Sequence, residues 1–229
     1  MRIYLSSPGS QLHADAARGM SVLLSFACYR PWLDKYAPSF EHVLIDSGAF
    51  SELTGAAKVD IGEYREWTER WRGRVDAIAG LDDIRGDWRR GMANYEAIPW
   101  TFPTFHNSDP MEILPDIVAL AKERGNWMGI GMVPPRTGKE EWLRRVTDQI
   151  PEGIHVHGWA LRLYTHVPRL DSTDSTNWIR DAMKIAGKLP WLTYGEALEI
   201  VVKRYQRWGR VLQPREVEAD LSFEAQTTQ

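Results

Sequence analysis

The sequence predicts an α/β fold, and within that class a compact (β/α)8 TIM-like barrel. Three observations favour it. Eight short apolar runs recur along the 229 residues, with amphipathic stretches between them, which is the alternation of a parallel sheet with crossover helices. The length of 229 residues suits one large hydrophobic core. It is also close to the length of such barrels, which take about 250 residues. Polar or ionisable residues end most of the runs, at the place where barrel enzymes carry their active sites.

The apolar runs predict strands at Arg2–Ser7, Val22–Tyr29, His42–Gly48, Ala77–Asp82, Thr101–His106, Trp127–Met132, Gly153–Trp159 and Arg169–Thr173. Helical periodicity predicts helices at Ile61–Trp71, Trp88–Ala97, Met111–Arg124, Lys139–Gln149, Ser175–Gly187 and Tyr194–Trp208. Ala14–Gly19 is a short helix at best. Two prolines within Tyr29–Ser39 exclude a long helix there.

An open doubly wound sheet is the competing architecture. It is disfavoured because no Gly-x-Gly-x-x-Gly follows the first strand, and Ser6–Ser10 is a poor phosphate-binding loop. No internal repeat or interdomain linker is visible. We therefore expect one domain over residues 1–215, followed by a polar, acidic tail over residues 216–229 that frays.

Composition excludes several classes of protein. A single cysteine, Cys28, excludes a disulfide framework and a thiolate-rich zinc site. The run Val22–Cys28 is far too short to span a bilayer, and the apolar start of the chain meets Ser6 and Pro8 too early for a secretory signal. We therefore expect a cytoplasmic protein that does not engage membranes.

The net charge of −3 argues against a generally basic nucleic-acid binder but allows local basic patches. Arginine and lysine gather in three clusters, which are Arg85, Arg89 and Arg90; Arg144 and Arg145; and Lys203, Arg204, Arg207 and Arg210. Several of the eleven tryptophans lie beside arginines. These patterns fit either solvated helix faces with tryptophan in the core or phosphate contacts flanked by stacking rings.

Ionisable and hydroxyl side chains end strand after strand. They are Ser6, Ser7, Tyr29, Asp46, Asp82, Asp83, His106, His157 and Asp174. The carboxyl ends of barrel strands meet at one face, so we expect these residues to gather there as a functional site. The alternative for any one of them is a cap for the following helix, since Asp and Ser are preferred caps.

Two of these residues stand in informative motifs. Asp46 precedes the small residues Ser47, Gly48 and Ala49 and then Phe50, whose ring can stack on a planar group. Asp174 lies among hydroxyl residues that equally suit a helix cap.

Glycine and histidine mark the ends of the next strands. Gly129 and Gly131 predict exposed backbone that a flat ligand could touch. His155 and His157 have a spacing seen in metal sites, but core packing for His155 and a pocket hydrogen bond for His157 are favoured, with no metal or cofactor expected.

Together these segments resemble the tRNA-guanine transglycosylase superfamily, and most closely its relatives that insert 7-deazaguanines into phage and bacterial DNA. Asp46-Ser47-Gly48-Ala49-Phe50 resembles the family signature, and Ser172–Trp178 resembles the segment that carries its nucleophilic aspartate. The other matching segments, in family order, are Gly80–Asp83, Pro103–His106, Gly129–Gly131 and His155–Gly158.

The resemblance implies exchange of guanine for a 7-deazaguanine through a covalent aspartyl–sugar intermediate. It assigns Asp174 as nucleophile, Asp46 as base contact and general acid/base, and Phe50 as stacking ring. Asp82 would read the edge of the purine. The remaining implied substrate-binding residues are Ser47, Gly48, His106, Gly129, Gly131, His157 and Gly158.

The chain departs from the tRNA enzymes, which are longer and carry a Cys-rich zinc subdomain. The missing cysteines favour DNA over tRNA as the partner, with a free nucleotide also open. Family members often dimerise, which makes a homodimer an open alternative. Three rival functions remain: an N-glycoside hydrolase or nucleoside-processing barrel, a non-catalytic subunit that binds deazapurine or nucleic acid, and a metal-dependent hydrolase.

Overall fold

A computed structural model describes residues 1–84, 86–131, 139–161, 167 and 169–210. Its eight strands form one parallel sheet in the order β4-β3-β2-β1-β8-β7-β6-β5. The strands are β1 (Arg2–Ser6), β2 (Ser21–Ser25), β3 (His42–Asp46), β4 (Ala77–Ile78), β5 (Thr104–His106), β6 (Trp127–Gly131), β7 (His155–Gly158) and β8 (Ser172–Ser175). Each predicted apolar run overlaps one of them, although β2 begins one residue before its run and β8 ends two residues after its run. The α/β class with eight parallel strands is confirmed.

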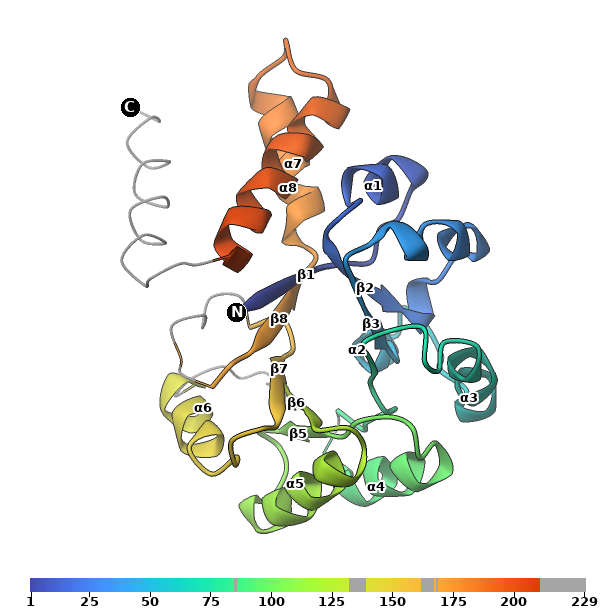
Figure 1. Cartoon of the computed structure of the whole chain (residues 1–229), viewed down its shortest axis with the longest axis vertical. Coiled ribbons are helices and arrows are strands. Elements are labelled where there is room, and N and C mark those ends of the chain that lie inside the picture. The colour runs from blue at the N-terminus through green and yellow to red at the C-terminus, as the bar shows by residue number, and fades with distance from the viewer. Residues whose placement is uncertain (85, 132–138, 162–166, 168, 211–229) are drawn as a thin grey trace.

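The first and last strands of the chain, β1 and β8, are paired in the middle of the sheet, and the sheet curls (Figure 1). Its two edge strands, β4 and β5, share no regular ladder. They are linked by one isolated parallel bridge between Ala79 and Phe102, in which the Phe102 N–H donates to Ile78 O at 2.8 Å. The curled sheet is therefore consistent with a TIM-like barrel, but its ladder is not closed.

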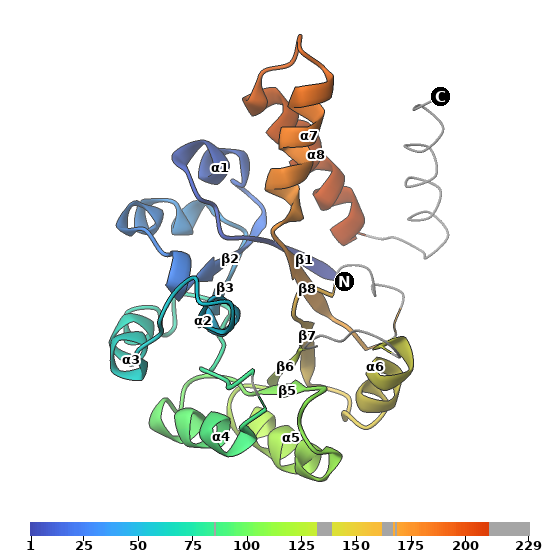
Figure 2. The same cartoon turned by 180° about the vertical axis from the view of Figure 1, so that it is seen from behind.

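The helices lie outside the curl (Figures 1 and 2). They are α1 (Gln11–Ala16), α2 (Ala49–Leu53), α3 (Ile61–Glu69), α4 (Trp88–Ala97), α5 (Leu114–Glu123), α6 (Lys139–Thr147), α7 (Asn177–Lys188) and α8 (Tyr194–Arg210). The six longer predicted helices are present, and the short one begins three residues earlier than expected. Helix α2 was not predicted, and the proline-containing segment forms only 3-10 turns at Pro31–Lys35 and Ala37–Ser39.

Alternate residues of each strand point to opposite faces of the sheet, which separates two apolar layers. Outward side chains such as Leu5, Ile45 and Ile130 pack beneath the helices. Inward side chains fill the curl with Tyr4, Leu23, Leu44, Ala79 and Phe102, against which Trp127 and Trp159 pack. The interior is thus a packed core and not a channel.

Two glycines of β6 make room for rings inside the curl. A Cβ on Gly129 would lie 2.4 Å from Trp159 Nε1, and a Cβ on Gly131 would lie 2.4 Å from His106 Cδ2. Both glycines are buried, so the exposed backbone expected at this strand end is not found. Their contact with a base stays a prediction.

No helix in the described part of the chain is sufficiently long and apolar to cross a lipid bilayer. The acidic segment 216–229 and the predicted phosphate contact Arg85 lie outside the described residues.

Candidate functional site

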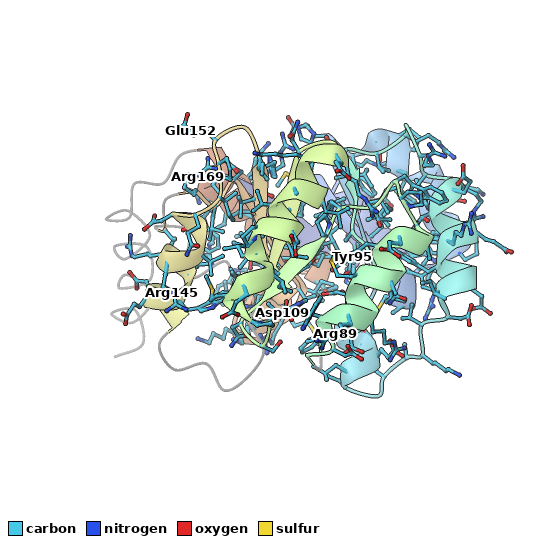
Figure 3. The ribbon with its side chains drawn as sticks, turned by 90° about the horizontal axis from the view of Figure 1, so that it is seen from below. Arg89, Tyr95, Asp109, Arg145, Glu152 and Arg169 are labelled. Carbon is cyan, nitrogen blue, oxygen red and sulfur yellow. The ribbon has the colours of Figure 1, made fainter. Side chains whose placement is uncertain are left out.

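The predicted acids meet at the carboxyl end of the sheet. Asp46 is the last residue of β3 and Asp174 lies in the second half of β8, with the two strands β2 and β1 between them. The charge of Asp174 raises the pKa of Asp46, so the two acids lie within electrostatic reach of each other. Figure 3 shows the two ends of the sheet, with Glu152 and Arg169 at the amino end and Asp109 at the carboxyl end. The polar side chains of the carboxyl end form the candidate site.

Asp174 is held by both carboxylate oxygens. Ser6 Oγ donates to Oδ2 at 2.8 Å, and the Ala160 backbone N–H donates to Oδ1 at 2.7 Å. Ala160 adopts a positive φ of 52°, a strained conformation for a residue with a Cβ that places this N–H beside the carboxylate. The side chain of Asp174 remains 13% exposed. The arrangement fixes an accessible carboxylate in one orientation.

His157 lies beside Asp174 and shares one serine with a second histidine. The buried His157 ring has Nε2 3.5 Å from Asp174 Oδ1, and this nitrogen has no hydrogen-bond partner among the described residues. Its Nδ1 lies 2.8 Å from Ser172 Oγ, which also lies 2.7 Å from His155 Nε2. Because a hydroxyl carries one proton, Ser172 donates to one ring and accepts from the other.

The direction of these two hydrogen bonds determines which nitrogen of His157 carries the proton. Burial, the largest cause, lowers the pKa of His155 to about 4, so that ring is neutral at neutral pH. If His155 Nε2 donates to Ser172, then Ser172 donates to His157 Nδ1 and the His157 proton sits on Nε2, toward Asp174. The two histidines of the His-x-His pattern thus share a serine.

Asp46 has the environment of a proton carrier. Burial raises the pKa of its carboxyl to about 6, hydrogen bonds from Ser25 and the Gly48 N–H oppose that rise, and the charges of Asp82 and Asp174 add to it. A carboxyl with a pKa near neutrality exchanges protons readily in both directions. The electrostatic coupling also places Asp46 near both other acids.

Gly48 supports this position of Asp46. It has a φ of +83° and a Cβ there would lie 2.4 Å from Ala27 Cβ, so only glycine fits. It also begins helix α2, whose Phe50 side chain is 58% exposed. Ser47 is buried, and its Oγ accepts from the Ala49 N–H at the start of α2.

A second acid–histidine group lies across the site. His106 Nε2 is 2.8 Å from Asp82 Oδ2, and Asp109 Oδ2 lies 3.6 Å from the other ring nitrogen while accepting from the His106 backbone N–H at 2.7 Å. Burial lowers the pKa of His106, but the two carboxylates outweigh it and raise the pKa to about 9. His106 is therefore a cation at neutral pH that fixes one oxygen of Asp82.

Sequence reasoning missed several partners of the predicted residues. Ser25 and the Ala160 N–H come from a neighbouring strand and a loop, and no pattern marks them. Asp109 follows His106 by three residues and could have been proposed from that spacing. The Cβ position of Gly158 faces Leu161 and Leu170 in the outer core, and its predicted contact with substrate stays a prediction.

The described cavities at this end are small. A cavity of about 30 Å³ lies beside Asp82 and Arg90, and one of about 10 Å³ lies beside Asp82 and His106. Ligand pockets usually measure about 300–1,000 Å³. The segments 132–138 and 162–166, which follow β6 and β7, lie outside the described residues. A larger cavity of about 400 Å³ lies at the opposite, amino end, lined in part by Arg2, His42 and His155.

Within the described ranges, no three His, Cys, Asp or Glu side chains are arranged to hold a metal ion. Comparisons with protein-family models, with curated proteins and with solved structures found no match to this chain.

Proposed function

We propose that this protein is a transglycosylase that exchanges guanine for a 7-deazaguanine in nucleic acid, with DNA favoured over tRNA. The observation that supports this function best is the pairing of two acids in different environments at one end of the sheet. Asp174 is a fixed carboxylate, and Asp46 has a pKa of about 6. Two such carboxyl groups suit a double displacement at a sugar carbon. The curled sheet is consistent with the (β/α)8 barrel on which we place this chemistry.

Asp174 acts as the nucleophile in this proposal. Its oxygen attacks the anomeric carbon of the nucleotide as the bond from that carbon to guanine breaks, and guanine leaves with the electron pair. Asp46, protonated, supplies the proton that the departing base needs. Ser6 and the Ala160 N–H orient the carboxylate for attack.

The second displacement reverses these roles. Asp46, now ionised, removes the proton from the ring nitrogen of the incoming 7-deazaguanine. That nitrogen attacks the anomeric carbon, and Asp174 leaves as a free carboxylate. His157 Nε2 lies 3.5 Å from Asp174 Oδ1, so a proton on that nitrogen offsets part of the charge that this oxygen bears.

The remaining residues suit recognition of a flat purine. Asp82 has one oxygen fixed by the His106 cation, which leaves its other oxygen to accept from the N–H groups of a guanine edge. Phe50 presents an exposed ring from α2 for stacking.

The test is incorporation of isotopically labelled 7-deazaguanines into DNA and RNA, followed by mass spectrometry of the nucleosides. The Asp174→Asn variant keeps the shape of the side chain but removes the nucleophile, and we expect incorporation to be lost. Asp116→Asn, on the exposed face of α5, is the matched control and should keep full activity. Unchanged incorporation by a folded Asp174→Asn protein would remove Asp174 from the mechanism.

An N-glycoside hydrolase is the second candidate. The pKa of Asp46 favours it equally, because a carboxylate with that pKa also activates water. The same mass spectra distinguish the two functions, since a hydrolase yields abasic sites or free sugar without incorporating a deazaguanine.

A further inference from the structure

Helix α7 carries a stripe of positive charge on its exposed side. Arg180, Lys184 and Lys188 are spaced by four residues and are all exposed, so they lie along one side at intervals of about 6 Å. The opposite side of the helix buries Trp178 and Ala182. We call Arg180, Lys184 and Lys188 the α7 stripe.

The cations of the α7 stripe are not paired with carboxylates of the described residues. The one acid of α7, Asp181, lies on the side that packs against α8, where it accepts a hydrogen bond from Tyr205 at 3.4 Å. None of the three stripe cations forms an ion pair with the described residues, and Arg180 donates only to the Asn177 amide oxygen. Their charges are available to an external anion.

In contrast to the α7 stripe, the basic clusters predicted from the sequence contain cations that form ion pairs. Arg90, Arg144 and Lys203 pair with carboxylates at 3.3, 3.0 and 3.9 Å. Their partners are Asp83, Glu140 and Glu199, so part of each cluster is neutralised within the molecule. Two of the clusters also lie apart on separate helices, as Arg89 on α4 and Arg145 on α6 show (Figure 3).

An exposed aromatic side chain follows the stripe. Trp191 is 75% exposed in the turn between α7 and α8, and Met183 on α7 is 61% exposed. The α7–α8 hairpin extends beyond the other helices, with this turn at its tip (Figures 1 and 2). Cations beside an exposed ring are the combination that binds a nucleic-acid strand, through phosphates and a stacked base.

The stripe begins close to the candidate site. Helix α7 starts at Asn177, three residues after Asp174, so a strand bound at Asp174 could continue along the helix. We propose that the α7 stripe and Trp191 bind the backbone and a base of the nucleic-acid strand whose nucleotide is held at Asp174. This proposal rests on the proposed function for its partner but has a test that does not require turnover.

The experiment measures binding of a fluorescently labelled single-stranded oligonucleotide by anisotropy over a series of salt concentrations. The test variant is Arg180→Gln/Lys184→Gln/Lys188→Gln in the full chain. Each lost phosphate contact lowers the slope of log K against log salt by about 0.7, so we expect the slope to fall by about 2. Trp191→Ala should weaken binding about tenfold with the slope unchanged.

The matched control removes the same charge elsewhere, as Arg18→Gln/Arg72→Gln/Lys122→Gln, and should keep the wild-type slope. A stripe variant with the wild-type slope and affinity overturns the proposal. So does a larger loss in Arg144→Gln/Arg145→Gln/Lys203→Gln, which would place the surface on α6 and α8. Binding of phosphatidylserine vesicles but not of oligonucleotides would identify a membrane surface instead.

The two proposals fail separately. Salt-dependent oligonucleotide binding that needs the stripe, without any base exchange, keeps the surface and rejects the transglycosylase. Base exchange that proceeds equally well in the stripe variant keeps the enzyme and rejects the surface.

Discussion

The proton on Asp46 decides which half of the proposed exchange can proceed. The carboxyl has a pKa of about 6 in the folded protein, against an ordinary value of 3.8. Expulsion of guanine needs the protonated form, and capture of the deazaguanine needs the ionised form.

Release of labelled guanine in a single turnover should therefore slow about tenfold for each pH unit above 6. Asp46→Asn should release guanine far more slowly and lose this pH dependence. A wild-type profile that is flat between pH 6 and 8 would show that Asp46 does not supply the proton.

His106 provides a residue-scale test that does not involve activity. Its folded pKa of about 9 exceeds the ordinary 6.5, so the stability it contributes is complete below pH 6.5 and is lost as the pH rises to 9. In urea unfolding, His106→Gln should cost about 3 kcal/mol at pH 6 and much less at pH 9.5. A cost that is equal at both pH values would mean that His106 is not a cation in the folded protein.

At the scale of elements, the turn from β3 into α2 depends on Gly48. In Gly48→Ala, the alanine must adopt a φ of +83°, and its Cβ lies 2.4 Å from Ala27 Cβ. Gly55→Ala is the matched control, since Gly55 has a φ of +74° but nothing within 4 Å of the added Cβ.

We expect Gly55→Ala to cost about 1 kcal/mol in the free energy of unfolding and Gly48→Ala about 3 kcal/mol, because only the second adds a clash. Denaturant unfolding measures both values. Equal costs would show that the chain relaxes around Ala27 without loss.

A helix or strand could be predicted where a short stretch of its own sequence marks it. The strands were predictable because short β-branched runs mark them, even where β4 shrinks to Ala77–Ile78. Helix α2 was not, because five residues are too few to show a helical period and its start depends on the conformation of Gly48. The acids at strand ends were predictable from the parallel sheet, whereas the fixing of Asp174 by the Ala160 N–H depends on a loop.

For the whole molecule, the weak point of the sheet lies between β4 and β5. The Phe102 N–H depends on one isolated bridge, whereas Leu5 lies in β1 with a paired strand on each side. Hydrogen–deuterium exchange should therefore be faster at Phe102 than at Leu5, through local opening. Equal protection of the two amides would show that the curl opens only by global unfolding.

The contents of the interior were the least predictable property of the molecule. The sequence shows two glycines in β6, but it does not show that Trp159 and His106 occupy the space beside them. That outcome depends on side chains from β5 and from the residue after β7, which meet over the glycines of β6. Sequence periodicity assigns a residue to a face of the sheet and does not say which neighbour fills the space.

The serine shared by two histidines gives the molecule an unusual link between its ends. Aromatic rings fill the middle of the curl between the acids and the hollow at the amino end, which His155 lines. The hydrogen bonds of His155, Ser172 and His157 cross that apolar layer, so a change of tautomer at one ring obliges the hydroxyl to rotate and the other ring to respond. The tautomer of the ring beside Asp174 thereby depends on a histidine that lines the far end of the protein.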